Sequence, residues 1–116
     1  MDTKKLFEAI DGMDANLFAS FLTEDVVFRF GNFPVVRGKE DVKTTVEQFF
    51  SSINGLSHKI SRTTEKGNSL IIEGDVTYTR KDNSKVIIPF ANIFDVRDKK
   101  VAIYLIYIDI SPLFAK

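Results

Sequence analysis

Hydrophobic residues recur at helical spacing through much of the first half of the chain. They lie three or four positions apart in residues 6–13, 17–22 and 39–53, with polar residues between them. Asp2 or Thr3 and Asp14 stand where helix N-caps belong, and Asn54-Gly55 ends the third segment with residues that tolerate a left-handed backbone. We therefore predict three helices, and the segment 39–53 carries the clearest pattern.

The periodicity changes from about 3.6 residues to two after Gly55 and stays there to the end of the chain. Residues 56–64, 70–80, 85–96 and 101–110 read as strands separated by short polar turns, and an earlier strand is predicted at 26–30. Within residues 70–80, Gly74 predicts a bulge or bend. Helices followed by a meander of strands indicate an α+β domain covering residues 1–116, in which a long curved antiparallel sheet packs against three helices of the N-terminal half.

The last predicted strand, residues 101–110, is apolar on both faces. Its odd-numbered residues form one face and its even-numbered residues the other, and both are rich in β-branched and aromatic side chains. A strand of this kind must be covered on both sides, whereas the helices can cover only one. We therefore predict a homodimer whose interface is the outer face of the last two strands, formed by Tyr104, Ile106, Ile108 and Ile93.

Composition restricts the classes of function. The chain is 44% hydrophobic with eleven phenylalanines, has no apolar run long enough to span a membrane, and balances sixteen basic with sixteen acidic residues. We expect an ordered protein that binds neither membranes nor nucleic acid, and with no visible secretory signal we expect it in the cytoplasm. Because cysteine is absent and there is one histidine, we expect no transition-metal site, and we expect no cofactor.

Asp109 is the one carboxylate in the strand predicted at 101–110. A carboxylate among apolar neighbours costs free energy unless it is paired, hydrogen-bonded or protonated, so Asp109 is a candidate functional residue with a raised pKa. The alternative is that Asp109, which precedes Ser111-Pro112, caps the strand end in solvent.

Several local phrases, in this order and spacing, resemble the nuclear transport factor 2-like superfamily and in particular its SnoaL-like branch. They are Phe21-Leu22-Thr23-Glu24-Asp25-Val26-Val27-Phe28, Arg37-Gly38-Lys39-Glu40, Ile93-Phe94-Asp95-Val96 and Tyr107-Ile108-Asp109. The resemblance covers essentially the whole chain. It implies a cone-shaped half-barrel with a pocket between the concave face of the sheet and the helices, frequent dimers, and roles that range from ketosteroid isomerases, polyketide cyclases, epoxide hydrolases and dehydratases to members without activity.

The catalytic residues of these families carry over poorly. The position of the general-base Asp of ketosteroid isomerases matches Phe30 or a close neighbour here, and the position of their second pocket Asp matches Ala91 or Asn92. None of these residues is acidic, so the chain does not resemble a ketosteroid isomerase in its catalytic residues. The arginine and carboxylate pairing of the epoxide hydrolases has no convincing match. Of these catalytic residues, only the late-strand carboxylate of the SnoaL-like cyclases has a candidate in this chain, which is Asp109.

A curved sheet of this kind would bring His58 to the same cavity as Asp109. Together they would transfer a proton to or from a carbon acid, whereas the alternative for His58 is a hydrogen-bonded residue of the cavity wall. The side chains predicted to line this mostly hydrophobic pocket are Tyr107, Tyr78, Asn92, Phe30, Phe28 and Phe50, although ordinary packing would equally account for the aromatic ones.

Three hypotheses follow from the sequence. The first, which we favour, is a SnoaL-like protein that binds a small hydrophobic molecule. The second is a cofactor-independent isomerase, cyclase or dehydratase that uses Asp109 with His58. The third is a homodimerising interaction module whose pocket is filled by its own side chains. The presence of an open cavity would distinguish the first hypothesis from the third. The distance between Asp109 and His58 around that cavity would distinguish the first from the second.

Overall fold

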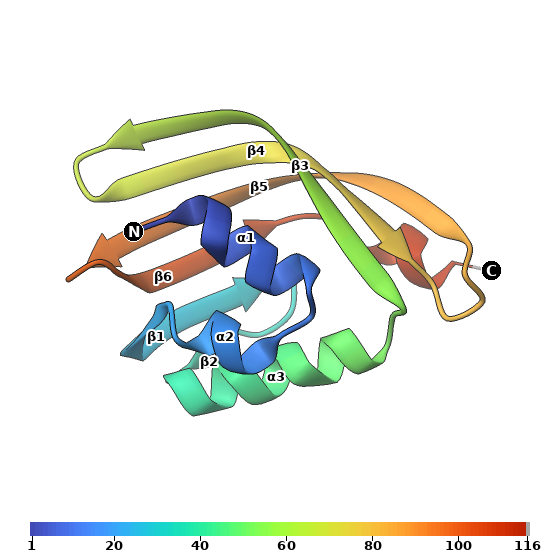
Figure 1. Ribbon diagram of the computed structural model, residues 1–116, viewed down its shortest axis with the longest axis horizontal. Coiled ribbons are helices and arrows are strands. Elements are labelled where there is room, and N and C mark those ends of the chain that lie inside the picture. Colours follow the sequence, from blue (N-terminus) through green and yellow to red (C-terminus); the bar gives the residue numbers. More distant parts are fainter. Residues whose placement is uncertain (116) are drawn as a thin grey trace.

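Three helices lie against one face of a six-stranded sheet in the computed structural model, which describes residues 1–115 (Figure 1). The helices are α1 (Thr3–Asp11), α2 (Ala15–Ala19) and α3 (Lys39–Ser51), and a short 3-10 helix, η1 (Ser111–Phe114), follows the last strand. The strands are β1 (Leu22–Phe30), β2 (Val36–Arg37), β3 (Gly55–Lys66), β4 (Ser69–Thr79), β5 (Lys85–Arg97) and β6 (Lys100–Tyr107). This arrangement confirms the predicted α+β fold.

The two predicted aspartate caps are confirmed. The Asp2 carboxylate accepts a hydrogen bond from the backbone N–H of Lys5 at 3.2 Å, and the Asp14 carboxylate accepts one from Leu17 at 3.0 Å. Each bond satisfies a backbone donor that the first turn of a helix leaves without a partner. The Asp14 cap separates α1 from α2 and so helps to set the helical hairpin that covers the sheet.

The strands are ordered β2-β1-β6-β5-β4-β3 across the sheet. Strands β3 to β6 form the predicted antiparallel meander, but β1 runs parallel to β6, with Phe28 opposite Tyr104. The sheet is therefore mixed, with one parallel pair in addition to the predicted antiparallel meander. Local turn signals cannot reveal this pair, because α3 and four strands lie between its members in the sequence.

Gly74 lies at the irregularity in the β3–β4 pairing that the sequence predicted, and Figure 1 shows both strands bending along their length. It lies opposite Ile60, where the register of β3 shifts before Arg62. A Cβ atom at position 74 would lie 2.1 Å from the Lys59 carbonyl oxygen, so only glycine allows this approach. The bend gives the sheet its concave face.

A β-bulge in the β5–β6 hairpin decides which side of β6 faces the helices. Next to the turn, Val96 pairs with Val101, whereas one step further Asp95 pairs with Ile103. The extra residue, Ala102, exchanges the faces of every later residue of β6 relative to β5. As a result the even-numbered residues of β6 from Tyr104 onward face the helices and the odd-numbered ones face away, whereas Val101, which precedes the bulge, is buried in the core.

The predicted interface was therefore wrong for three of its four residues. Tyr104 is buried in the core, and Ile106 and Ile108 lie on the concave side. Ile93 does lie on the outer face, where it pairs with Leu105. A regular hairpin would have put Ile93 on the same face as Tyr104, and the bulge prevents this.

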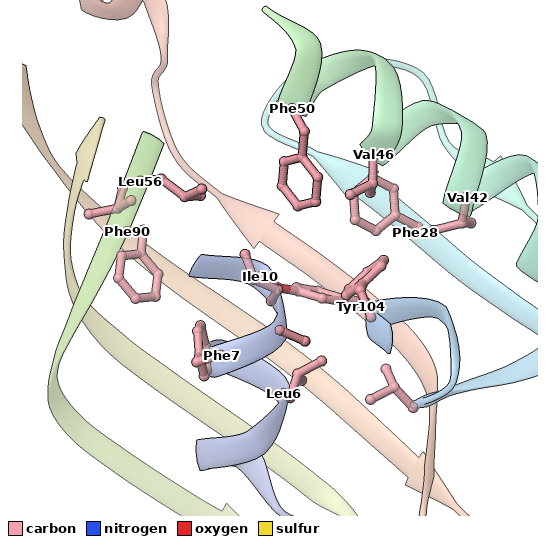
Figure 2. Close-up of a cluster of buried hydrophobic side chains, with 14 of the residues drawn as sticks. Leu6, Phe7, Ile10, Phe28, Val42, Val46, Phe50, Leu56, Phe90 and Tyr104 are labelled. Carbon is pink, nitrogen blue, oxygen red and sulfur yellow. The ribbon is translucent and has the colours of Figure 1, made fainter. Parts of the chain in front are cut away.

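The core fills the space between the helices and the concave face. Figure 2 shows Ile10 of α1 and Phe50 of α3 approaching Tyr104, which comes from the sheet. The ring centroids of Phe94 and Tyr104 lie 4.4 Å apart, and both side chains are buried. No helix within residues 1–115 is long and apolar enough to span a membrane.

Candidate functional site

A cavity of about 50 Å³ lies within the concave side of the sheet, beneath α3. Its wall is mostly aromatic and aliphatic, with a few polar side chains. The lining residues are Ile10, Phe18, Phe28, Phe30, Thr45, Val46, Phe49, Phe50, Leu56, His58, Val76, Tyr78, Phe90, Asn92, Tyr104, Ile106 and Ile108. Because one water needs about 10–15 Å³ of such space, the cavity has room for about four water-sized groups.

Aromatic rings lead from the surface to the interior of the cavity. Phe33 is 52% exposed, and its ring centroid lies 6.2 Å from that of Phe30. Phe30 in turn contacts Phe49 at 4.8 Å, and Phe49 lies 5.7 Å from Tyr78, both in edge-to-face geometry. Phe30 and Phe49 are only partly buried, so they lie on a part of the cavity wall that reaches toward solvent.

Asp11, the last residue of α1, holds His58 of β3 by two hydrogen bonds. The His58 ring nitrogen Nδ1 lies 2.6 Å from Asp11 Oδ1, and the His58 backbone N–H donates to Asp11 Oδ2 at 3.1 Å. The His58 side chain is 10% exposed. Since Nδ1 is engaged by the carboxylate, Nε2 is the ring nitrogen left for other partners.

Two phenylalanine rings fix the orientation of the His58 ring. Phe7 and Phe90 have centroids 5.0 and 5.1 Å from it, and the Phe90 contact is edge-to-face. His58 also lines a groove of about 340 Å³ between α1 and β3, together with Asp11. The Asp11–His58 pair therefore lies between the buried cavity and this open groove.

Two tyrosine hydroxyl groups belong to the polar part of the wall. Burial raises the pKa of Tyr78, and the negative charge of Asp11 raises it further. Burial also raises the pKa of Tyr104, with added contributions from Tyr78 and Asp11. Both hydroxyls therefore remain protonated at neutral pH and can donate hydrogen bonds.

Asn92 of β5 is the most deeply buried polar side chain of the wall, at 1% exposure. Its side-chain oxygen Oδ1 is enclosed and has no hydrogen-bond partner among the described residues. Leaving a buried acceptor unpaired costs about 1–3 kcal/mol. A group of this kind in a cavity wall is where a bound molecule would find a partner.

Five of the six predicted pocket residues line the cavity, namely Tyr78, Asn92, Phe30, Phe28 and Phe50, and so does His58. The sixth, Tyr107, points away from the cavity and is 47% exposed. The Arg29 guanidinium lies over its ring, 5.1 Å from the centroid. The bulge in the β5–β6 hairpin places Tyr104 in the cavity wall and Tyr107 on the opposite face of the sheet.

Asp109 lies outside the cavity, so the prediction that it is buried among apolar side chains was wrong. The residue follows the end of β6, is exposed, and its carboxylate accepts a hydrogen bond from the Ser111 backbone N–H at 2.9 Å. Hydrogen bonds from Ser111 lower the pKa of Asp109, which is the opposite of the predicted direction. Asp109 thus caps the turn into η1.

The carboxylate that pairs with His58 is Asp11, which the sequence analysis missed. A signal was present, because a carboxylate at the C-terminal end of a helix faces the negative end of the helix dipole and is unfavourable there unless it has another partner. Tyr104 was also missed as a cavity residue, because the sequence analysis assigned it to the interface. Within residues 1–115, no group of three or more His, Cys, Asp or Glu side chains could hold a metal ion.

The family model for the SnoaL-like domain matches residues 3–104. The chain belongs to the SnoaL-like family. No match was found among curated proteins. The fold is shared with solved structures of low sequence identity, and these show the fold alone.

Three solved structures share this fold. A putative SnoaL-like polyketide cyclase from Jannaschia has a TM-score of 0.82 and 16% identity, covering 96% of this chain and 85% of that one. A protein of ketosteroid isomerase-like fold from Catenulispora acidiphila, in complex with trimethylamine, has a TM-score of 0.86 and 15% identity, covering 96% and 87%. An LEH-like epoxide hydrolase from M. tuberculosis has a TM-score of 0.81 and 20% identity, covering 97% and 83%.

Proposed function

We propose that this SnoaL-like protein binds a small, largely apolar molecule in the cavity beneath α3, with Asn92 as its polar anchor. The observation that carries the proposal is the enclosed Asn92 Oδ1, which has no partner among the described residues. Leaving this acceptor unpaired is costly, and a ligand that donates a hydrogen bond would satisfy it. The surrounding apolar wall would supply the rest of the binding free energy.

The size of the cavity restricts the ligand. Pockets for drug-sized ligands measure about 300–1,000 Å³, whereas this one measures about 50 Å³. A larger molecule would need Phe30 and Phe49 to move, and their partial exposure to solvent favours them as the gate. The Catenulispora acidiphila neighbour was solved with trimethylamine, a small molecule of the size expected here, and at 15% identity this likeness supports the proposal through the fold alone.

A titration with small probe molecules, followed by NMR, tests the proposal. Saturable shifts are expected at the Asn92 side-chain amide and at the Ile106 and Ile108 methyl groups, which line the cavity. The variant Asn92→Leu removes the acceptor and keeps a similar shape, so it should bind hydrogen-bond donors more weakly. If a screen of alcohols, amines and amides produced no saturable shift at these groups, the proposal would be wrong.

A second candidate function is acid–base catalysis, favoured by the 2.6 Å contact between Asp11 Oδ1 and His58 Nδ1. With Nδ1–H donated to the carboxylate, His58 Nε2 would act as a general base on a carbon acid in the cavity. Asp11 would act as the positioning residue, the part that the sequence analysis gave to Asp109. Turnover of a carbonyl compound that is lost in His58→Gln, together with a shifted pH profile in Asp11→Asn, would support this function.

The outer face of the sheet is our proposed homodimer interface. It carries Ile87 at 66% exposure and Ile71 at 40%, and it continues through the neighbouring Ile93 and Leu105. Hydrophobic surface that extends over several strands favours association over exposure to water. The predicted face is retained, while its β6 residues change from even to odd numbers.

A further inference from the structure

We propose that the ligand of this cavity is a small primary carboxamide, whose N–H group donates to Asn92 Oδ1 and whose carbonyl oxygen accepts from the Tyr104 hydroxyl. The inference rests on the proposed function, because it names the chemical class of the molecule bound in the same cavity. Three features of the wall support it, namely its lack of charge, its unpaired polar groups and the places of those groups in the sheet.

The first feature is the lack of charge in the wall. None of the lining residues is aspartate, glutamate, lysine or arginine. His58, whose ring can take up a proton, already has its Nδ1 engaged by the Asp11 carboxylate. An ion that leaves water for such a place loses its hydration and finds no free opposite charge to replace it. The wall therefore selects an uncharged molecule.

The second feature is that the wall holds an unpaired acceptor and an unpaired donor. Asn92 Oδ1 accepts hydrogen bonds only, and it has no partner among the described residues. Tyr104 is 3% exposed, and its hydroxyl makes no hydrogen bond to another residue within 1–115. Burial raises the pKa of Tyr104, so this hydroxyl keeps its proton and can donate it in a hydrogen bond. A ligand satisfies both groups only if it carries a donor and an acceptor.

The third feature is the placement of these two groups on neighbouring strands. Asn92 of β5 pairs with Ile106 of β6, and Tyr104 precedes Ile106 by two residues on the same face. Asn92 and Tyr104 are thus diagonal neighbours, whose backbones lie about 7–8 Å apart. A carboxamide presents its N–H and its carbonyl oxygen on two different atoms of one rigid plane, whereas an alcohol uses a single oxygen for both. A carboxamide is therefore the better bridge between two separate side chains.

Acetamide, acetone, acetate and acetamidinium form a matched series of probes for this inference. All four are planar and have four non-hydrogen atoms, which suits a cavity with room for about four water-sized groups. Acetamide is neutral and carries a donor and an acceptor, acetone lacks the donor, and the other two are ions.

NMR titration of the wild-type protein should give saturable shifts at the Asn92 side-chain amide. The dissociation constant of acetamide should be about tenfold lower than that of acetone, which leaves Oδ1 unpaired, and neither ion should saturate. If acetone or an ion bound as tightly as acetamide, or if only other molecules of the wider screen bound, the carboxamide inference would be wrong while the proposed function stood. If nothing in either set bound, both would be wrong.

Two variants separate the roles of the acceptor and the donor, with the Ile106 methyl groups as the NMR signal. Asn92→Leu should remove the preference for acetamide over acetone. Tyr104→Phe should weaken both probes severalfold and keep their ratio, because both carry a carbonyl oxygen. Tyr107→Phe makes the same change on the opposite face of the sheet, so it serves as the matched control and should bind as the wild type does. A full preference for acetamide in Asn92→Leu, or unchanged acetamide binding in Tyr104→Phe, would contradict the corresponding contact.

Discussion

Asp11 and His58 are 47 residues apart in the sequence and are joined by two hydrogen bonds, one to the ring and one to the backbone of the histidine. The pair links the end of α1 to β3 at the edge of the cavity. A carboxylate that accepts two hydrogen bonds in a partly buried place contributes more than an exposed ion pair does. The pair thus has a structural role whatever the cavity binds.

Replacing Asp11 by alanine should lower the free energy of unfolding by about 1–3 kcal/mol, because both donors of His58 lose their acceptor. Asp11→Asn should cost less, since the amide oxygen can still accept one of the two bonds. Urea denaturation of both variants measures the difference, and Glu65→Ala is the control for loss of an exposed acid. Equal stability of wild type and Asp11→Ala would show that the contact contributes nothing.

Asp109 should titrate below the ordinary aspartate range, because the carboxylate form is held by Ser111. A folded-state pKa below the unfolded one means that this group stabilises the protein above the unfolded value and loses that contribution as the pH falls through the folded value. A carboxyl NMR titration gives the pKa directly. In the variant Asp109→Asn, this part of the pH dependence of stability should disappear. A raised pKa in the wild type would instead indicate that Asp109 is buried.

Phe49→Ala should enlarge the cavity at a part of its wall that reaches toward solvent. Since the Phe49 ring contacts Phe30 and Tyr78 but is only partly buried, we expect a loss of about 2–3 kcal/mol, at or below the lower end for buried phenylalanines. Benzene, which is larger than the cavity, should bind this variant more tightly than the wild type. Phe33→Ala, at a mostly exposed site, should change stability by less than about 1 kcal/mol. Unchanged benzene affinity in Phe49→Ala would exclude this residue as the gate.

The dimer proposal predicts different effects for lysine substitutions at two neighbouring residues of β6. Leu105→Lys places a charge on the outer face and should give a folded monomer, whereas Ile106→Lys places one in the cavity wall and should destabilise the fold by about 2–4 kcal/mol. Sedimentation velocity at micromolar concentration measures the oligomeric state, and circular dichroism measures folding. A wild-type monomer under these conditions would rule out the interface.

Local structure was readable from the sequence because its causes are local. The caps at Asp2 and Asp14 act on backbone groups three residues away, and the bend at Gly74 depends on the absence of a side chain at that position. Helical and strand periodicity likewise comes from residues within one element. These signals also led to the α+β architecture and to five of the six predicted pocket residues.

The faces of β6 and the partner of His58 were decided only by the tertiary structure. One extra residue in the β5–β6 hairpin exchanged the inner and outer residues of the last strand, and alternation by itself cannot locate such a bulge. Asp11 reaches His58 because α1 packs across β3, a contact that no spacing in the sequence encodes. The cavity is small because aromatic side chains from different elements fill most of the concave face. Local backbone preferences determine the elements, whereas pairing between distant segments determines which side chains meet.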